Sequence, residues 1–155
     1  MSASEIRKRL PEETWEKYRT FTIVRNPFDR AVSRYFWDVK RGKNEGLNFG
    51  AFFLRFPDRL TDNLRIAPLS GPDKLDIYLR YDHLKEDFAA HGLASIWDDF
   101  NRLRAKSGSR PRMKNTQDEL YQDNPNVVAL INDLCREEIE CFGWHFDSSP
   151  AADRE

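Results

Sequence analysis

The sequence lacks the features of several large protein classes. No run of apolar residues approaches the roughly 18 that a membrane-spanning helix needs, and the first residues, MSASEIRKRLPEE, have no apolar core like that of a signal peptide. Lysine and arginine number 25 and aspartate and glutamate 26, a formal net charge of −1. This balance creates no overall attraction to nucleic acid or to an anionic membrane. We therefore expect a soluble, cytoplasmic protein with no transmembrane segment and no nucleic-acid partner, in which any anion site is local.

Cysteine is scarce, with two in 155 residues. Cys135 and Cys141 are six positions apart in a predicted helix, which places them on different faces and about 9 Å apart along the axis. That separation disfavours a disulfide between them. No pair of cysteine or histidine residues has the spacing typical of metal ligands. The sequence therefore predicts reduced thiols and no metal site.

Two compact apolar stretches, residues 21–25 and 75–81, predict buried strands. Residues 57–73 and 102–116 are expected to be mostly loop. Helical patterns cover most of the remainder, at residues 4–10, 12–18, 27–40, 49–56, 83–91 and 125–142. This order of elements predicts an α/β fold with a small parallel sheet flanked by helices.

The predicted sheet is thin, because two strands are marginally stable by themselves and parallel strands usually have more neighbours. Either further strands lie within residues 60–69, or an N-terminal strand is absent from this sequence. A strand missing at one side would expose a sheet edge, so self-association into a homo-oligomer is expected. The length suits a single domain with a modest core, which we place over residues 1–147, with a disordered tail over residues 148–155.

Residues 20–35, TFTIVRNPFDRAVSRY, join the first predicted strand to a predicted helix. Asn26, followed by a proline, is a typical helix start. At about 100° per residue, Asn26, Arg30 and Ser33 fall on one face of this helix, and Arg25 lies at the strand end just before that face. The opposite, apolar face consists of Phe28, Val32, Tyr35 and Val39.

This arrangement is typical of an anion site. The first turn of a helix has unsatisfied N–H donors and a partial positive charge, an arginine can clamp a phosphate with two hydrogen bonds, and ligands of open α/β sheets bind beyond the carboxyl ends of strands. Arg25 and Ser33 are therefore candidate phosphate ligands. The alternative is a capped helix whose polar face is solvated and carries an ion pair, Arg30–Asp29 or Arg34–Asp38.

Several other side chains receive structural interpretations. Asp82 is expected to cap the helix over residues 83–91, and His83 to be structural or capping. Glu86 and Asp87 are interpreted as a solvated helix face. The aromatic residues of the 49–56 helix, Phe49, Phe52, Phe53 and Phe56, are predicted to be core, with the lining of an acceptor-sugar site as the alternative.

The stretch FTIVRNPFDRAVSRYFW resembles the 3′-phosphate-binding motif of the carbohydrate-type sulfotransferases, written VRNP, two residues, R, two residues, S. These enzymes use 3′-phosphoadenosine-5′-phosphosulfate (PAPS). Three later segments resemble the family in the same order: LDIYLRYDHLKEDFAAHGL, RLRAKSGSRPRMKNTQDELYQD and VVALINDLCREEIECFGWHF. The similarity runs from about Ser4 to Phe146.

The resemblance implies a P-loop-like sulfotransferase fold and sulfuryl transfer from PAPS to a hydroxyl or amine of a carbohydrate-like acceptor, without a metal. By position, Arg25 and Ser33 would hold the 3′-phosphate, with Asn26 and Arg30 beside them. A basic loop that closes over the nucleotide in the family corresponds here to residues 104–114. Its candidate nucleotide-binding residues are Lys106, Ser107, Arg110, Arg112 and Lys114.

One part of the family pattern is not found. The family begins with a strand and a PK-T-x-x-T-like loop that holds the 5′-phosphosulfate, and neither that loop nor a catalytic base ahead of the motif occurs in this sequence. The resemblance thus implies an N-terminally truncated domain with no identified catalytic residue. Three explanations stay open: the sequence is a fragment or mis-started gene product, it is a degenerate relative, or another chain supplies the missing loop. The alternative function is a catalytically incomplete module of the same fold that binds a nucleotide or a partner chain.

Overall fold

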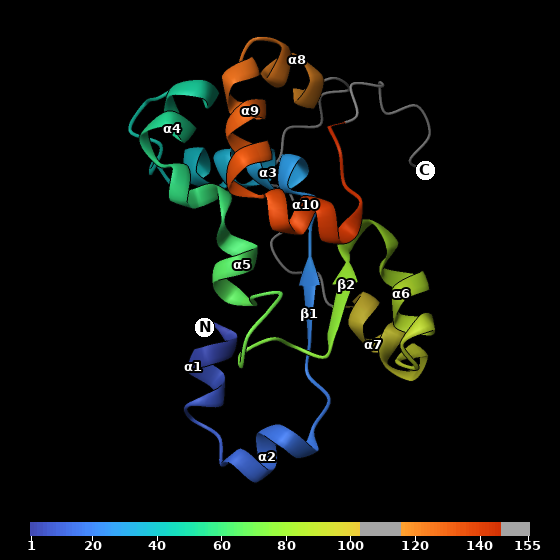
Figure 1. The fold of residues 1–155 in the computed structure, drawn as a ribbon. Helices are drawn as coiled ribbons and strands as arrows, with labels where there is room; N and C mark the ends of the chain where they lie inside the picture. The colour runs from blue at the N-terminus through green and yellow to red at the C-terminus, as the bar shows by residue number, and fades with distance from the viewer. Residues whose placement is uncertain (103–115, 147–155) are drawn as a thin grey trace. The chain divides into compact units, whose positions relative to one another are not determined.

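The computed structural model describes residues 1–102 and 116–146 (Figure 1). The chain divides into two compact units. The first comprises Met1–Asn26 with Asp62–Ala105, and the second comprises Pro27–Thr61 with Lys106–Glu155. Each unit is built from two separate stretches of chain. The prediction of a single domain over residues 1–147 stays a prediction.

The first unit is built around a two-stranded parallel sheet (Figure 1). Strand β1 (Phe21–Val24) pairs with β2 (Ile77–Arg80), in a register that sets Phe21 opposite Ile77 and Val24 opposite Arg80. The amino ends of the strands are tied by Asp76, whose Oδ2 accepts hydrogen bonds from the main-chain N–H (2.7 Å) and the hydroxyl (2.8 Å) of Thr20. This bridge fixes the register before either strand begins.

Short helices cover the sheet of the first unit. They are α1 (Ala3–Arg7), α2 (Glu12–Lys17), α5 (Asp62–Ile66), α6 (Leu84–Ala90) and α7 (Trp97–Arg102), with 3-10 turns at Tyr81–His83 and Ala94–Ile96. Because successive strand residues face opposite sides, Ile77 and Leu79 pack with Phe88 of α6, whereas Tyr78 packs against a second small cluster that contains Ala3 and Leu75. The sheet is therefore covered on both faces.

The second unit is helical. Its elements are α3 (Pro27–Lys40), α4 (Phe49–Arg55), the 3-10 turn η1 (Pro57–Leu60), α8 (Thr116–Gln122), α9 (Pro125–Leu134) and α10 (Arg136–Phe142). Its core is rich in aromatic rings: Phe28, Phe49, Phe52, Phe53 and Tyr121 are all buried. The prediction that the aromatic residues of the 49–56 helix form core is confirmed for Phe49, Phe52 and Phe53, and Phe56 packs beside them partly buried.

The α/β class and the small parallel sheet are confirmed, and several boundaries are corrected. The stretch predicted as mostly loop over residues 57–73 contains η1 and α5, so the region 60–69 holds helical turns rather than further strands. The second strand is shorter than residues 75–81. Val39, expected in the core, is 39% exposed. Asp82 lies within a 3-10 turn, and His83 is the residue that precedes α6, so Asp82 does not cap that helix.

The helix predicted over residues 125–142 is broken at Cys135, whose φ of −109° and ψ of 17° leave the helical range. The break divides the segment into α9 and α10. It also lets the Cys135 thiol donate a hydrogen bond to the main-chain oxygen of Leu60, 75 positions earlier, at 3.3 Å. The local pattern stays helical on both sides of this residue, so periodicity gives no sign of the break.

No helix within residues 1–102 and 116–146 has the length and apolar character to cross a bilayer. The P-loop-like sulfotransferase fold, which the resemblance implied, stays a prediction.

Candidate functional site

Arg25 and Tyr81 are the first residues to leave the sheet of the first unit at its carboxyl edge. Each directly follows a strand, and Val24 and Arg80, the residues before them, are paired in the sheet. The guanidinium carbon of Arg25 lies 4.6 Å from the centre of the Tyr81 ring, within the range of a cation–π contact. Tyr81 itself is 52% exposed. The parallel pairing thus places the predicted phosphate ligand on a solvent-facing aromatic ring.

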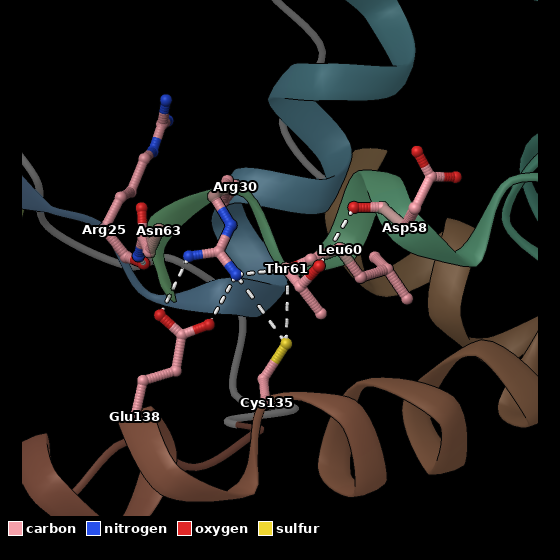
Figure 2. A network of polar contacts seen from close by, with 8 residues as sticks. All are labelled: Arg25, Arg30, Asp58, Leu60, Thr61, Asn63, Cys135 and Glu138. Carbon is pink, nitrogen blue, oxygen red and sulfur yellow. Dashed lines mark hydrogen bonds and ion pairs between the residues drawn. The ribbon is translucent and has the colours of Figure 1, made fainter. Parts of the chain in front are cut away.

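Asn63 holds the main chain of Arg25. Its side-chain amide, carried by α5, donates a hydrogen bond of 3.1 Å to the Arg25 carbonyl oxygen, and Figure 2 shows the two residues side by side. The backbone of Arg25 is thereby fixed from one side and its guanidinium from the other. An arginine with both ends held loses less side-chain freedom when it binds an anion.

Asp87 fixes the end of the neighbouring strand. Its carboxylate accepts three hydrogen bonds from Arg80: from the main-chain N–H to Oδ2 at 2.7 Å, from Nε to Oδ2 at 3.1 Å, and from Nη2 to Oδ1 at 2.7 Å. The side-chain bonds from Arg80 lower the pKa of Asp87, and the bond from its main chain adds to this. The same bonds raise the pKa of Arg80. We call Arg25, Asn63, Arg80, Tyr81 and Asp87 the carboxyl-edge cluster.

The carboxyl-edge cluster was found only in part by sequence reasoning. Arg25 was predicted, but Asp87, interpreted as a solvated residue, is buried, and the roles of Asn63 and Tyr81 were missed. A signal for Asp87 was present, because it stands seven residues after an arginine at the end of a strand and on the first turn of the following helix. His83, by contrast, is half exposed and lies 3.8 Å from Asp82, in keeping with a structural role.

Ser33 and Arg30 lie on α3, which belongs to the second unit. Ser33 is partly exposed, as is Asn26, which joins β1 to α3 in the sequence. The predicted Arg34–Asp38 ion pair is confirmed, with Nε 2.8 Å from Oδ2 and Asp38 buried. The polar face of α3 thus includes at least one ion pair of the kind expected for a structural helix.

Arg30 is engaged inside the second unit (Figure 2). Its Nη1 and Nη2 donate to the two carboxylate oxygens of Glu138, at 3.0 and 2.5 Å, and Nη2 also donates to the carbonyl oxygen of Leu60. Glu138 is 1% exposed. This ion pair joins α3, η1 and α10, so the structure gives Arg30 an internal partner where the sequence predicted a nucleotide contact. Arg30 is therefore not one of the phosphate ligands that we propose for this protein.

Cys135 borders the same ion pair, with its sulfur 3.6 Å from Nη2 of Arg30. Burial is the main cause that raises the pKa of this thiol to about 12, and the charge of Glu138 adds to it. The thiol therefore stays protonated near neutral pH and donates to Leu60. Both cysteines are free, as predicted, with Cys135 buried and Cys141 exposed. Buried thiols with a raised pKa are typically structural.

The predicted ligands of the basic loop, Lys106, Ser107, Arg110, Arg112 and Lys114, lie outside the described residues. Among the residues that are described, no three His, Cys, Asp or Glu side chains gather in a way that could hold a metal ion.

Comparison with known proteins identifies one relative and no characterised family. No protein-family model matches the chain, and no solved structure matches it. An uncharacterized protein of the archaeon Archaeoglobus fulgidus is 33% identical over 97 residues, and the match covers 57% of this chain and 77% of that protein. Such identity over most of the relative indicates common descent. The chain therefore belongs to the same protein family as this archaeal protein.

Proposed function

We propose that the protein binds a 3′-phosphorylated adenine nucleotide and is a sulfotransferase-type domain, with Arg25 as the principal ligand of the 3′-phosphate. The observation that carries the proposal is the position of Arg25: it follows a parallel strand directly, at the carboxyl edge of the sheet, and its guanidinium lies over Tyr81. Open α/β sheets bind ligands at this edge. The resemblance also makes Ser33 a candidate phosphate ligand.

The reaction proposed for the complete site is sulfuryl transfer from PAPS to a hydroxyl or amine of a carbohydrate-like acceptor. The acceptor atom forms a bond to sulfur, the bond from sulfur to the 5′-phosphate oxygen breaks, and adenosine 3′,5′-bisphosphate leaves. The acceptor proton passes to a general base. Cationic groups stabilise the charge that develops on the leaving phosphate.

A second candidate is a binding module that holds the nucleotide or a partner chain without transfer. The observation in its favour is that the residues this candidate requires, those that resemble the 3′-phosphate motif, are present in the sequence. The two candidates share the 3′-phosphate site and differ in turnover. Incubation with sulfur-labelled PAPS and a panel of oligosaccharides separates them: labelled product together with released bisphosphate supports the transferase, and tight binding without product supports the module.

The phosphate site is tested by calorimetry with adenosine 3′,5′-bisphosphate and adenosine 5′-monophosphate. We expect the bisphosphate to bind more tightly, because only it presents a 3′-phosphate. The change Arg25→Ala should weaken bisphosphate binding about 10-fold or more, the scale of hydrogen bonds to a charged group, and should leave binding of the monophosphate nearly unchanged.

The matched control is Arg19→Ala. Arg19 lies before β1, as Arg25 lies after it, and its guanidinium donates to the main-chain oxygen of His91 at 3.1 Å. Removal of this arginine changes the net charge by the same amount at the other end of the strand, so bisphosphate affinity should change less than twofold. Equal affinities for wild type and Arg25→Ala, or no binding of the bisphosphate by either, would refute the site.

A further inference from the structure

The carboxyl-edge cluster contains an ion pair between Arg80 and Asp87, with Nη2 2.7 Å from Oδ1. Asp87 is buried, and all three of its hydrogen bonds described above go to Arg80. One of them comes from the main-chain N–H of Arg80, the last residue of β2. This bond sets the direction in which the chain leaves the sheet, because the next residue begins the 3-10 turn Tyr81–His83.

The Tyr81 side chain is about half exposed, and its ring stacks with the Arg25 guanidinium at 4.6 Å. A ring with this exposure is placed chiefly by its backbone, and that backbone is held through Arg80. Asp87 is thus hydrogen-bonded to Arg80, and Arg80 is followed in the chain by Tyr81. The ring of Tyr81 in turn stacks with the guanidinium of Arg25.

We infer that Asp87 is a positioning residue: through Arg80 and Tyr81 it sets the orientation of the Arg25 guanidinium that receives a phosphate monoester dianion. The statement that Arg25 receives a phosphate rests on the proposed function. The statement that Asp87 sets the orientation of the guanidinium concerns the protein without ligand. Asn63 holds the backbone of Arg25 from the other side, so the loss of Asp87 should move the guanidinium without moving the end of β1.

The test is the Nε–Hε resonance of Arg25 in proton–nitrogen correlation spectra, assigned by its loss in Arg25→Lys. An aromatic ring beneath the guanidinium shifts this proton upfield. Tyr81→Leu should remove the shift and Tyr81→Phe should keep it. Asp87→Asn, which keeps the size of the side chain but loses its charge, should move the resonance in the same direction as Tyr81→Leu. It should also lower affinity for adenosine 3′,5′-bisphosphate about 2- to 5-fold, the factor for loss of an exposed cation–π contact.

Asp76→Asn is the matched control. Asp76 also bridges the two strands through hydrogen bonds, at the amino edge of the same sheet, so its loss destabilises the first unit without acting on Tyr81. The Arg25 resonance and bisphosphate affinity should both keep their wild-type values in this variant. If Asp87→Asn does not fold, Asp87→Glu takes its place, because glutamate keeps the charge and moves the carboxylate away from the main-chain N–H of Arg80.

The two proposals fail in different ways. An Arg25 resonance that keeps its wild-type position in Asp87→Asn or Asp87→Glu, or that moves equally far in Asp76→Asn, overturns the positioning role, even where Arg25→Ala abolishes binding. Undiminished binding in Arg25→Ala overturns the phosphate site, even where the resonance responds as expected. The spectra are recorded on the full chain without nucleotide, so the positioning result does not depend on a ligand.

Discussion

Arg30 and Glu138 form a charged pair with almost no access to water, with side-chain exposures of 11% and 1%. Charges in such a place are costly unless they are paired and hydrogen-bonded. Here the guanidinium meets both carboxylate oxygens and the carbonyl oxygen of Leu60. The pair is therefore tolerated in the core of the second unit. Removal of one partner should lower the free energy of unfolding more than removal of both, because the remaining charge would be buried without its partner.

The first prediction follows from that asymmetry. Arg30→Met leaves the buried carboxylate of Glu138 without its arginine and should lower the free energy of unfolding by about 3 kcal/mol. The double change Arg30→Met with Glu138→Leu should recover most of this loss. Urea denaturation measures both. Arg136→Met serves as the control, because its pair with Asp133 is well exposed at both ends and should contribute less than about 1 kcal/mol. A double variant as unstable as the single one would contradict the asymmetry.

For individual residues, sequence periodicity predicted the helix face on which a side chain lies but not the residue that it contacts. Arg25 and Arg30 were selected by the same reasoning, yet one lies over Tyr81 in the first unit and the other faces Glu138 in the second. Glu138 is 108 positions from Arg30, and no local pattern signals a contact at that distance. Asp87 was misjudged for a related reason, since a carboxylate in the first turn of a helix normally faces solvent.

Helices and strands were predicted correctly where the residues nearby in the sequence determine where an element begins or ends. Strand β1, helix α3 and the division of the N-terminal helices at Pro11 follow from apolar runs and proline positions, and all three are confirmed. The end of α6 follows in the same way from Gly92, which adopts a φ of 71°. The break at Cys135 did not follow, because the apolar pattern is helical on both sides of it, and the Cys135 contact is with the distant main-chain oxygen of Leu60.

Helix α4 approaches the start of α9 closely enough to require a glycine. A Cβ atom on Gly50 would lie 2.0 Å from Oδ1 of Asn124, whose amide nitrogen is bound to the carbonyl oxygen of Leu120 at 2.8 Å. An added methyl group must displace Asn124 and break that hydrogen bond. Gly50→Ala should therefore lower the free energy of unfolding by about 1 kcal/mol, even though alanine is the better helix former.

Gly50→Ala should have the opposite effect on the free energy of unfolding once the Asn124 side chain is removed. In an Asn124→Ala background, Gly50→Ala should raise the free energy of unfolding by about 0.5–1 kcal/mol, the usual gain of alanine over glycine in a helix. Denaturant unfolding of the four proteins gives the coupling between the two positions. Equal effects of Gly50→Ala in both backgrounds would show that the close approach does not limit this position.

For the whole molecule, two carboxylates that bridge elements of the first unit determine part of the response to acid. Hydrogen bonds from Arg80 lower the pKa of Asp87, and those from Thr20 lower the pKa of Asp76, each from an ordinary value of 3.8. The folded protein thus binds these protons more weakly than the unfolded chain does. The stabilisation is complete above the ordinary pKa and is lost as the pH falls through the lower folded values.

The expected result is a melting temperature that is steady above about pH 5 and falls steeply below about pH 4. Asp87→Asn and Asp76→Asn should each have a lower melting temperature near neutral pH and a shallower fall in acid, so that the curves converge at the lowest pH. Thermal unfolding followed by circular dichroism from pH 2.5 to 7 measures this. Curves that stay parallel to the wild-type curve would contradict a role for these two carboxylates.

Neither unit is a continuous stretch of chain, and this has a consequence for synthesis on the ribosome. When β1 has been made, its partner β2 is still more than fifty residues away, and the core of the second unit also waits for Tyr121, Val127 and Ile131. The aromatic residues of α3 and α4 therefore emerge long before the helices that cover them. Most of the chain must be translated before either core can close, so the phenylalanines of α3 and α4 lack their native packing partners during much of synthesis.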